Sequence, residues 1–285
     1  MTEALRLPGL TAAENATLNR LLVQLRRVRT RNLKRDLYHR AHARLQGNIR
    51  SGVIPERYYR MGLVLGWCEK AVTALARRTN LAEIVWPGHD LDALGWPDLA
   101  AGNAWRTEIH GALIESLVHG PSFLVTSTPS PAEISAGAPA AAVHGVSALH
   151  GTGILNPRTR RLDAFLKVTH EKAGHIGELT LYLPGRQITA YRPLGETGPT
   201  GTWEILADNR HPYGVPVEPL VYRPRTGRPF GASRITPPMM AIQDAGLREL
   251  IRLEGHMDVF SFPQFWLLRG SGLSSFRCIW VICDG

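Results

Sequence analysis

The sequence predicts an α+β fold in which N-terminal helices precede a set of short antiparallel strands, and one long helix follows the strands. Three observations support this. Apolar residues recur at helical spacing in three segments before residue 120. Between residues 121 and 222 the pattern changes to short runs that are typical of strands. Helical spacing then returns over residues 239–260.

The first helix is expected to begin at a capping box, because Thr11 and Glu14 are spaced so that each side chain can bond the backbone N–H of the other. The apolar positions that follow at helical spacing are Leu18, Leu22, Leu25 and Val28. Its other face is basic and carries Arg20, Arg26, Arg27, Arg31, Lys34 and Arg35. We expect five of these to contact phosphate or an acidic partner, with a solvated face as the alternative: Arg26, Arg27, Arg31, Lys34 and Arg35.

Two further helices are predicted before the strands. One begins near Pro55, since proline is favoured in a first helical turn. Its apolar stripe consists of Met61, Leu65, Cys68, Val72 and Leu75. The other covers residues 101–119 and ends at Gly120-Pro121, because glycine caps a helix and proline cannot continue it.

The middle of the chain is predicted to form strands at 123–126, 162–168, 179–183, 187–191, 203–206 and 219–222. The clearest pair flanks Pro184-Gly185, which is a hairpin signal, so 179–183 is expected to pair antiparallel with 187–191. Residues 129–143 are rich in Pro, Ala, Ser and Gly, which predicts a surface loop of weak structure.

The long helix predicted at 239–260 follows two prolines and ends before Pro263. Its apolar residues near one side are Ile242, Leu250, Leu253 and Met257. The stretch 269–285 differs from the rest, because it holds two of the three cysteines and ends inside an apolar run.

Composition narrows the class of protein. The 285 residues are 44% hydrophobic, enough for the core of one large domain or two modest ones. The net charge of +9 comes almost wholly from arginine, whose planar fork suits phosphate, although a composition rich in Arg, Ala and Gly is also typical of a GC-rich genome. Three cysteines without metal-type spacing suit a reducing compartment. The longest uncharged stretch, 134–157, contains Pro139 and is not expected to cross a membrane, so we expect a soluble intracellular protein.

No catalytic constellation is recognisable in the sequence. The histidines of HEKAGH at 170–175 are five residues apart rather than four, which predicts a solvated loop instead of a metal site. Ser147 lies in GVSAL, which lacks the second glycine of a nucleophile elbow. Asp90, Asp92 and Asp98 are typical of turn and cap chemistry. We therefore expect no enzymatic activity, no cofactor and no metal.

The order of several segments resembles phage portal proteins of the siphophage type, particularly those of actinobacterial phages. The segments are Leu37-Tyr38, RYYRMGLVLGWCEKAVTALARRT (57–79), IHGALIESLVHGPSFLVT (109–126), LNPRTRRLDAFLKV (155–168), ELTLYLPGRQITAYR (178–192), Trp203-Glu204, HPYGVPVEPLVYRP (211–224), GRPFGASRITPPMMAIQDAGLRELI (227–251) and FPQFW (262–266). Together they cover roughly residues 11–268.

The resemblance implies a wing domain at residues 1–235, a first stem helix and the start of a clip at 236–268, and an aberrant tail at 269–285. It also implies that the apolar side of this stem helix packs against the stem helices of neighbouring subunits, through Ile242, Leu250, Leu253 and Met257. It also implies a homo-oligomeric ring, normally of twelve subunits, at the portal vertex of the virion, assembled in the host cytoplasm. Double-stranded DNA passes through the channel of such a ring during packaging and ejection. The implied protein partners are the terminase large subunit, the scaffold or capsid protein and the head-tail adaptor, and no membrane is implied.

The family pattern continues after the first stem helix with a clip, a second stem helix and a crown, and we expect these parts to be largely missing here. A truncated, frameshifted or prophage-remnant product is therefore expected. Ring closure is then expected to fail or to become strongly concentration-dependent, giving monomers or ill-defined aggregates. The alternative function is a basic nucleic-acid-binding or adaptor protein without enzymatic activity, and a third is an enzyme of unrecognised type.

Overall fold

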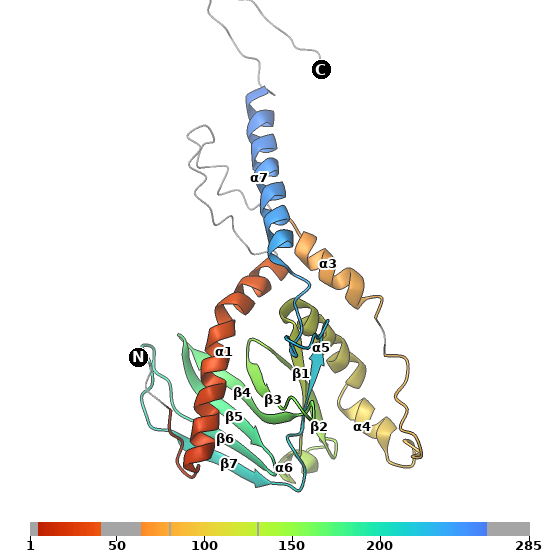
Figure 1. Ribbon diagram of the computed structural model, residues 1–285, viewed down its shortest axis with the longest axis vertical. Coiled ribbons are helices and arrows are strands. Elements are labelled where there is room, and N and C mark those ends of the chain that lie inside the picture. The colour runs from red at the N-terminus through yellow and green to blue at the C-terminus, as the bar shows by residue number, and fades with distance from the viewer. Residues whose placement is uncertain (1–4, 41–63, 80, 130, 261–285) are drawn as a thin grey trace, which may run out of the picture.

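The computed structural model describes residues 5–40, 64–79, 81–129 and 131–260. Two antiparallel sheets form the body, α1 covers one side, and α7 projects from one end (Figure 1). The predicted α+β class is confirmed. None of the helices in the described part of the chain is both long and apolar enough to span a membrane.

Helix α1 (Ala12–His39) begins at the predicted capping box. The backbone N–H of Glu14 donates to Thr11 Oγ1 at 3.3 Å, and the backbone N–H of Thr11 donates to Glu14 Oε2 at 2.7 Å. Arg186 then ties this end of the helix to the sheet, because its guanidinium contacts both Glu14 at 2.9 Å and Asp208 at 2.7 Å. The predicted start of the helix is therefore confirmed.

The larger sheet has the strand order β3-β4-β5-β6-β7. Its strands are β3 (Gly151–Leu155), β4 (Leu162–Lys172), β5 (His175–Leu183), β6 (Arg186–Tyr191) and β7 (Glu204–Arg210). The predicted hairpin around Pro184-Gly185 is confirmed, with Leu181 opposite Ile188. Gly185 has φ 75°, a conformation that favours glycine in a tight turn.

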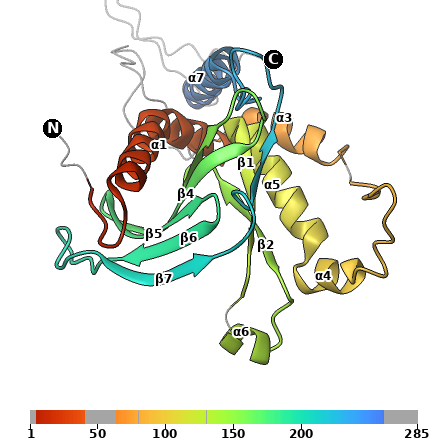
Figure 2. The same ribbon diagram turned by 60° about the horizontal axis from the view of Figure 1, so that its bottom comes forward.

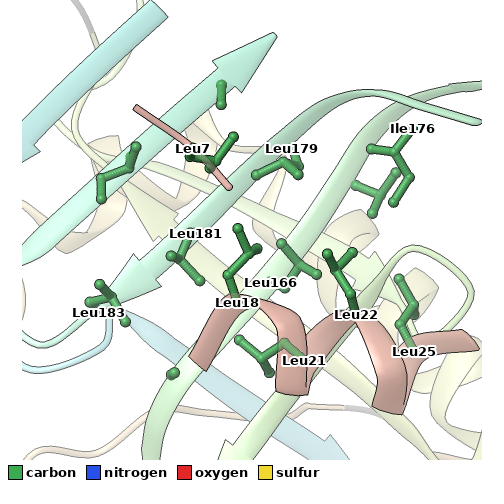
Figure 3. Close-up of a cluster of buried hydrophobic side chains, with 14 residues drawn as sticks. Leu7, Leu18, Leu21, Leu22, Leu25, Leu166, Ile176, Leu179, Leu181 and Leu183 are labelled. Carbon is green, nitrogen blue, oxygen red and sulfur yellow. The ribbon is translucent and has the colours of Figure 1, made fainter. Parts of the chain in front are cut away.

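The core between α1 and this sheet is built from leucines (Figure 3). Leu18, Leu21, Leu22 and Leu25 form the buried stripe of the helix. Alternate residues of β5, namely Leu179, Leu181 and Leu183, face them, because successive side chains of a strand point to opposite faces. The helix is thereby fixed along its N-terminal half.

The smaller sheet has the order β2-β1-β8. Its strands are β1 (Pro121–Ser127), β2 (Ala142–Ser147) and β8 (Val217–Val221). Phe123 of β1 packs on Phe165 of β4 at a ring separation of 4.7 Å, which joins the two sheets. Helix α5 (Trp105–His119) lies against the same small sheet, where Ser122 Oγ donates to the Ala112 carbonyl at 2.6 Å. The N-terminal half of α1, the large sheet, the small sheet and α5 follow one another in Figure 2, while the C-terminal half of α1 contacts α5 directly.

Helix α7 (Pro237–Phe260) confirms the predicted long helix and begins two residues earlier. Two polar contacts anchor its first turns. The Tyr38 hydroxyl donates to the Asp244 carboxylate at 2.8 Å, and the Cys68 backbone N–H donates to Gln243 Oε1 at 2.9 Å. Cys68 belongs to α3 (Trp67–Ala76), so α1 and α3 together fix the direction in which α7 leaves the body.

Several elements differ from the sequence-based expectation. The helix predicted at 101–119 is split into α4 (Trp96–Gly102) and α5, because Ala104 has φ 47° and the Asn103 side chain bonds to β2 rather than to the next turn. Of the helix predicted to begin near Pro55, the structure describes only α3, in which Cys68 and Val72 are buried as expected. Residues 41–63, Pro263 and the stretch 269–285 lie outside the described residues.

The predictions missed β2, β3 and α6 (Pro131–Ser135), a short helix inside the expected loop at 129–143. Strand β3 contains Gly151 and Gly153, where close packing leaves no room for a side chain. A Cβ at Gly151, for example, would lie 2.7 Å from the Phe165 ring. The segment 170–175 is not a solvated loop. It belongs to β4 and β5 except for a two-residue turn, Ala173-Gly174, in which both residues have positive φ.

We expect Leu21→Ala to lower the free energy of unfolding by about 2–5 kcal/mol, because Leu21 is fully buried between α1 and the sheet. The matched control is Val23→Ala on the same helix, where the side chain is 64% exposed and the expected change is under about 0.5 kcal/mol. Urea unfolding followed by circular dichroism measures both. Equal losses in the two variants would contradict the described core.

Candidate functional site

The structure separates the predicted basic residues of α1 into two groups. Helical periodicity places Arg20, Arg27, Arg31, Lys34 and Arg35 on one side, called here the basic face of α1. Arg26 lies on a different side, near Arg192, where the burial of Arg192 and the charge of Arg26 lower the pKa of the Arg192 guanidinium. Arg26 and Arg31 are five residues apart and therefore point about 140° apart on the helix. Contact of these side chains with phosphate or an acidic partner stays a prediction.

A cavity of about 370 Å³ lies beside the basic face of α1. Arg31 and Arg35 line one wall, and Arg228, from the loop between β8 and α7, lines another. No local sequence pattern indicates Arg228, because it is almost two hundred residues from Arg31 and lies beside the helix only in the folded protein. Three guanidinium groups around one cavity form a natural site for a carboxylate or a phosphate.

Arg35 is the most enclosed of the three arginines. Its Nη1 donates to the His119 carbonyl at 2.9 Å, which fixes the side chain at the base of the cavity. Burial, together with the nearby charge of Arg31, lowers the pKa of Arg35 to about 10. The group stays charged at neutral pH, and an anion that enters the cavity would relieve its repulsion with Arg31.

Asn32 adds a polar group to the same cavity. Its Nδ2 donates to the Ala148 carbonyl at 3.2 Å, while its Oδ1 is buried without a hydrogen-bond partner among the described residues. A buried acceptor in this state favours a ligand that brings a donor as well as a negative charge.

The second surface is the exposed side of α7. Ile242, Leu253 and Met257 are 61%, 54% and 55% exposed, and Leu250 is partly exposed beside them. Leu250 and Leu253 also line a groove of about 650 Å³ with Leu65 and Trp67. Packing of this side against another helix stays a prediction. The sequence reasoning did not identify the buried side of the helix, which consists of Met240, Gln243, Leu247 and Ile251.

A third surface, formed by residues 81–107, was not predicted. Trp86, Trp96 and Trp105 line a groove of about 730 Å³ there. The expected turn chemistry is present, because Asp90 Oδ1 accepts from the backbone N–H of Asp92 at 3.0 Å. The three tryptophans between residues 86 and 105 are the sequence feature that could have indicated an interaction surface in addition to the predicted turn.

Across the described ranges, no group of three His, Cys, Asp or Glu side chains is placed to hold a metal ion. His170 and His175 lie on neighbouring strands, where His170 is opposite Glu178 and His175 is opposite Lys172. The surfaces that the structure presents suit contacts with macromolecules. Surfaces of this kind are typical of proteins that bind or assemble with other macromolecules.

Sequence comparison agrees with this class. The chain is 31% identical over 156 residues to the portal protein of Mycobacterium phage L5 and 29% identical over 156 residues to the portal protein of Mycobacterium phage D29. Each match covers 53% of this chain and 30% of the relative, so the chain spans less than a third of the length of these curated relatives. No protein-family model matches the chain. The resemblance to phage portal proteins that the sequence indicates is confirmed.

We expect pyrophosphate, used as a probe anion, to raise the melting temperature of the protein, because a ligand that binds only the folded state stabilises it. Arg31→Ala/Arg228→Ala should lose this response, since both side chains line the cavity. Arg158→Ala/Arg161→Ala removes two exposed arginines from the turn between β3 and β4 and should keep it. Differential scanning fluorimetry measures the shift. An unchanged response in the Arg31→Ala/Arg228→Ala variant would refute the site.

Proposed function

We propose that this chain is a structural, non-enzymatic subunit of a phage portal, the ring at the head-tail connector vertex through which DNA is packaged and ejected. The observation that carries the proposal is the similarity to two mycobacteriophage portal proteins. In this proposal the body up to residue 235 is the wing, and α7 is the first stem helix, which extends with the start of a clip to residue 268.

The form of α7 supports this role. A ring closes when each subunit presents one face to its neighbour on one side and a different face on the other. The exposed apolar side of α7 is suited to pack against the corresponding helix of a neighbour. The anchors at Asp244 and Gln243 hold the helix at a fixed angle to the body, which a repeated subunit contact requires.

Placement and partners follow from the same proposal. The subunit would reside in the virion and assemble in the host cytoplasm. Double-stranded DNA would pass through the channel, and the terminase large subunit, the scaffold or capsid protein and the head-tail adaptor would contact the ring. A basic nucleic-acid-binding or adaptor protein is the second candidate, favoured by the three arginines around the cavity. Strongly salt-dependent DNA binding by a monomer would select that candidate.

We expect copies of the chain to associate weakly and in a concentration-dependent manner through α7. Leu253→Ser should weaken self-association by about tenfold or more, because burying a leucine side chain contributes roughly 1.5–3 kcal/mol. Sedimentation equilibrium over a wide concentration range measures the effect.

The control for this variant is Arg248→Ser, which places the same residue at an exposed position on another side of α7. Its helix propensity cost is matched, so it should associate like the unmodified chain. Association of Leu253→Ser that equals that of the unmodified chain would count against α7 as a packing surface.

A further inference from the structure

The segment 81–107, which contains every residue that lines the groove, has a net charge opposite to that of the whole chain. It contains four acidic residues, Glu83, Asp90, Asp92 and Asp98, and one basic residue, Arg106, within a chain whose formal net charge is +9. All four acidic residues are exposed. A net negative charge on one segment of an oppositely charged protein attracts a complementary surface.

The same segment exposes large apolar groups. Trp86 is 53% exposed and Val85 is 70% exposed, and both line the groove of about 730 Å³. Glu83, Asp90 and Asp92 line it as well, so carboxylates and aromatic rings occur together. Tryptophan faces attract guanidinium groups, and carboxylates accept their hydrogen bonds. The groove therefore has the chemistry to receive an arginine-rich surface.

The basic face of α1 has the matching chemistry. Arg27, Arg31 and Lys34 are exposed there, and the arginine-lined cavity opens beside them. Helix α1 and the segment around α4 lie on opposite flanks of the two sheets in both views (Figures 1 and 2). They are too far apart to meet within one chain, so a contact between them must join two copies.

We infer that the acidic tryptophan groove of one copy receives the basic face of α1 and the adjacent Arg228 of a second copy, head to tail. Glu83 and Asp92 meet Arg31 and Arg228, and Trp86 covers an arginine side chain. Two different faces make the contact, so it leaves one acidic and one basic face open and propagates to a third copy. The inference rests on the proposed function, because it identifies a contact between neighbouring wings of the proposed ring.

Two charge-reversal variants test the contact. The groove variant is Glu83→Lys/Asp92→Lys, and the helix variant is Arg31→Glu/Arg228→Glu. Asp90 is left in place because it caps the turn at Asp92, and Arg35 is left because it bonds to the His119 carbonyl. Each variant alone turns the contact into a repulsion and should weaken self-association by about tenfold or more. An equimolar mixture restores complementary charges at every contact and should associate like the unmodified chain.

Matched controls carry the same charge changes elsewhere. Glu204→Lys/Glu218→Lys places them on exposed positions of β7 and β8, and Arg158→Glu/Arg161→Glu places them on the turn between β3 and β4. Sedimentation velocity at low and high salt measures association, and circular dichroism checks that each variant folds. The controls should associate like the unmodified chain, and the attraction should weaken at high salt.

The outcomes separate the inference from the proposed function. Association that persists unchanged in both reversal variants, but is lost in Leu253→Ser, would overturn the inference and leave the proposed function standing. Failure of the mixture to restore association would overturn it as well. Loss of DNA binding in the helix variant, with self-association unaffected, would assign the basic face to nucleic acid instead. An unmodified chain that stays monomeric at every concentration would contradict both.

Discussion

The packing of α1 on the five-stranded sheet is the interaction on which the other features depend. The buried leucines of α1 occupy one side of the helix, so the arginines on another side stay outside the core. Asn32, Arg35 and Tyr38 follow on the C-terminal half, where they meet the cavity and α7. Burial and the bond to Asp244 raise the pKa of Tyr38, which keeps the hydroxyl protonated as a donor. One helix therefore positions both the basic cavity and the projecting helix α7.

The sequence predicted the elements whose signal is local. The capping box at Thr11, the hairpin at Gly185 and the helix after Pro237 each depend on residues a few positions apart. Strand β3 was missed because it contains Gly151 and Gly153, and glycine has a low strand propensity. A Cβ at Gly151 would clash with Phe165 and one at Gly153 with Leu162, and both of these residues come later in the chain.

The candidate site likewise contains residues that a local sequence pattern predicted and residues that it did not. Arg31 and Arg35 were predicted because they repeat on one helix. Arg228 and Asn32 enter the site through tertiary packing, and no local pattern marks them. Asp90 and Asp92 were predicted as turn residues, and Asp90 accepts from the backbone N–H of Asp92. Their proposed role as charged contacts depends on the groove and on the basic face of α1, which are far apart in the sequence.

In the proposed assembly, portal-type subunits meet through unlike faces. Cryo-electron microscopy of the concentrated protein shows how neighbouring copies are related. We expect arcs or rings in which successive copies are related by a constant rotation, with the α7 helices side by side toward one axis. Two-fold dimers with identical faces in contact, or α7 helices turned away from one another, would contradict it.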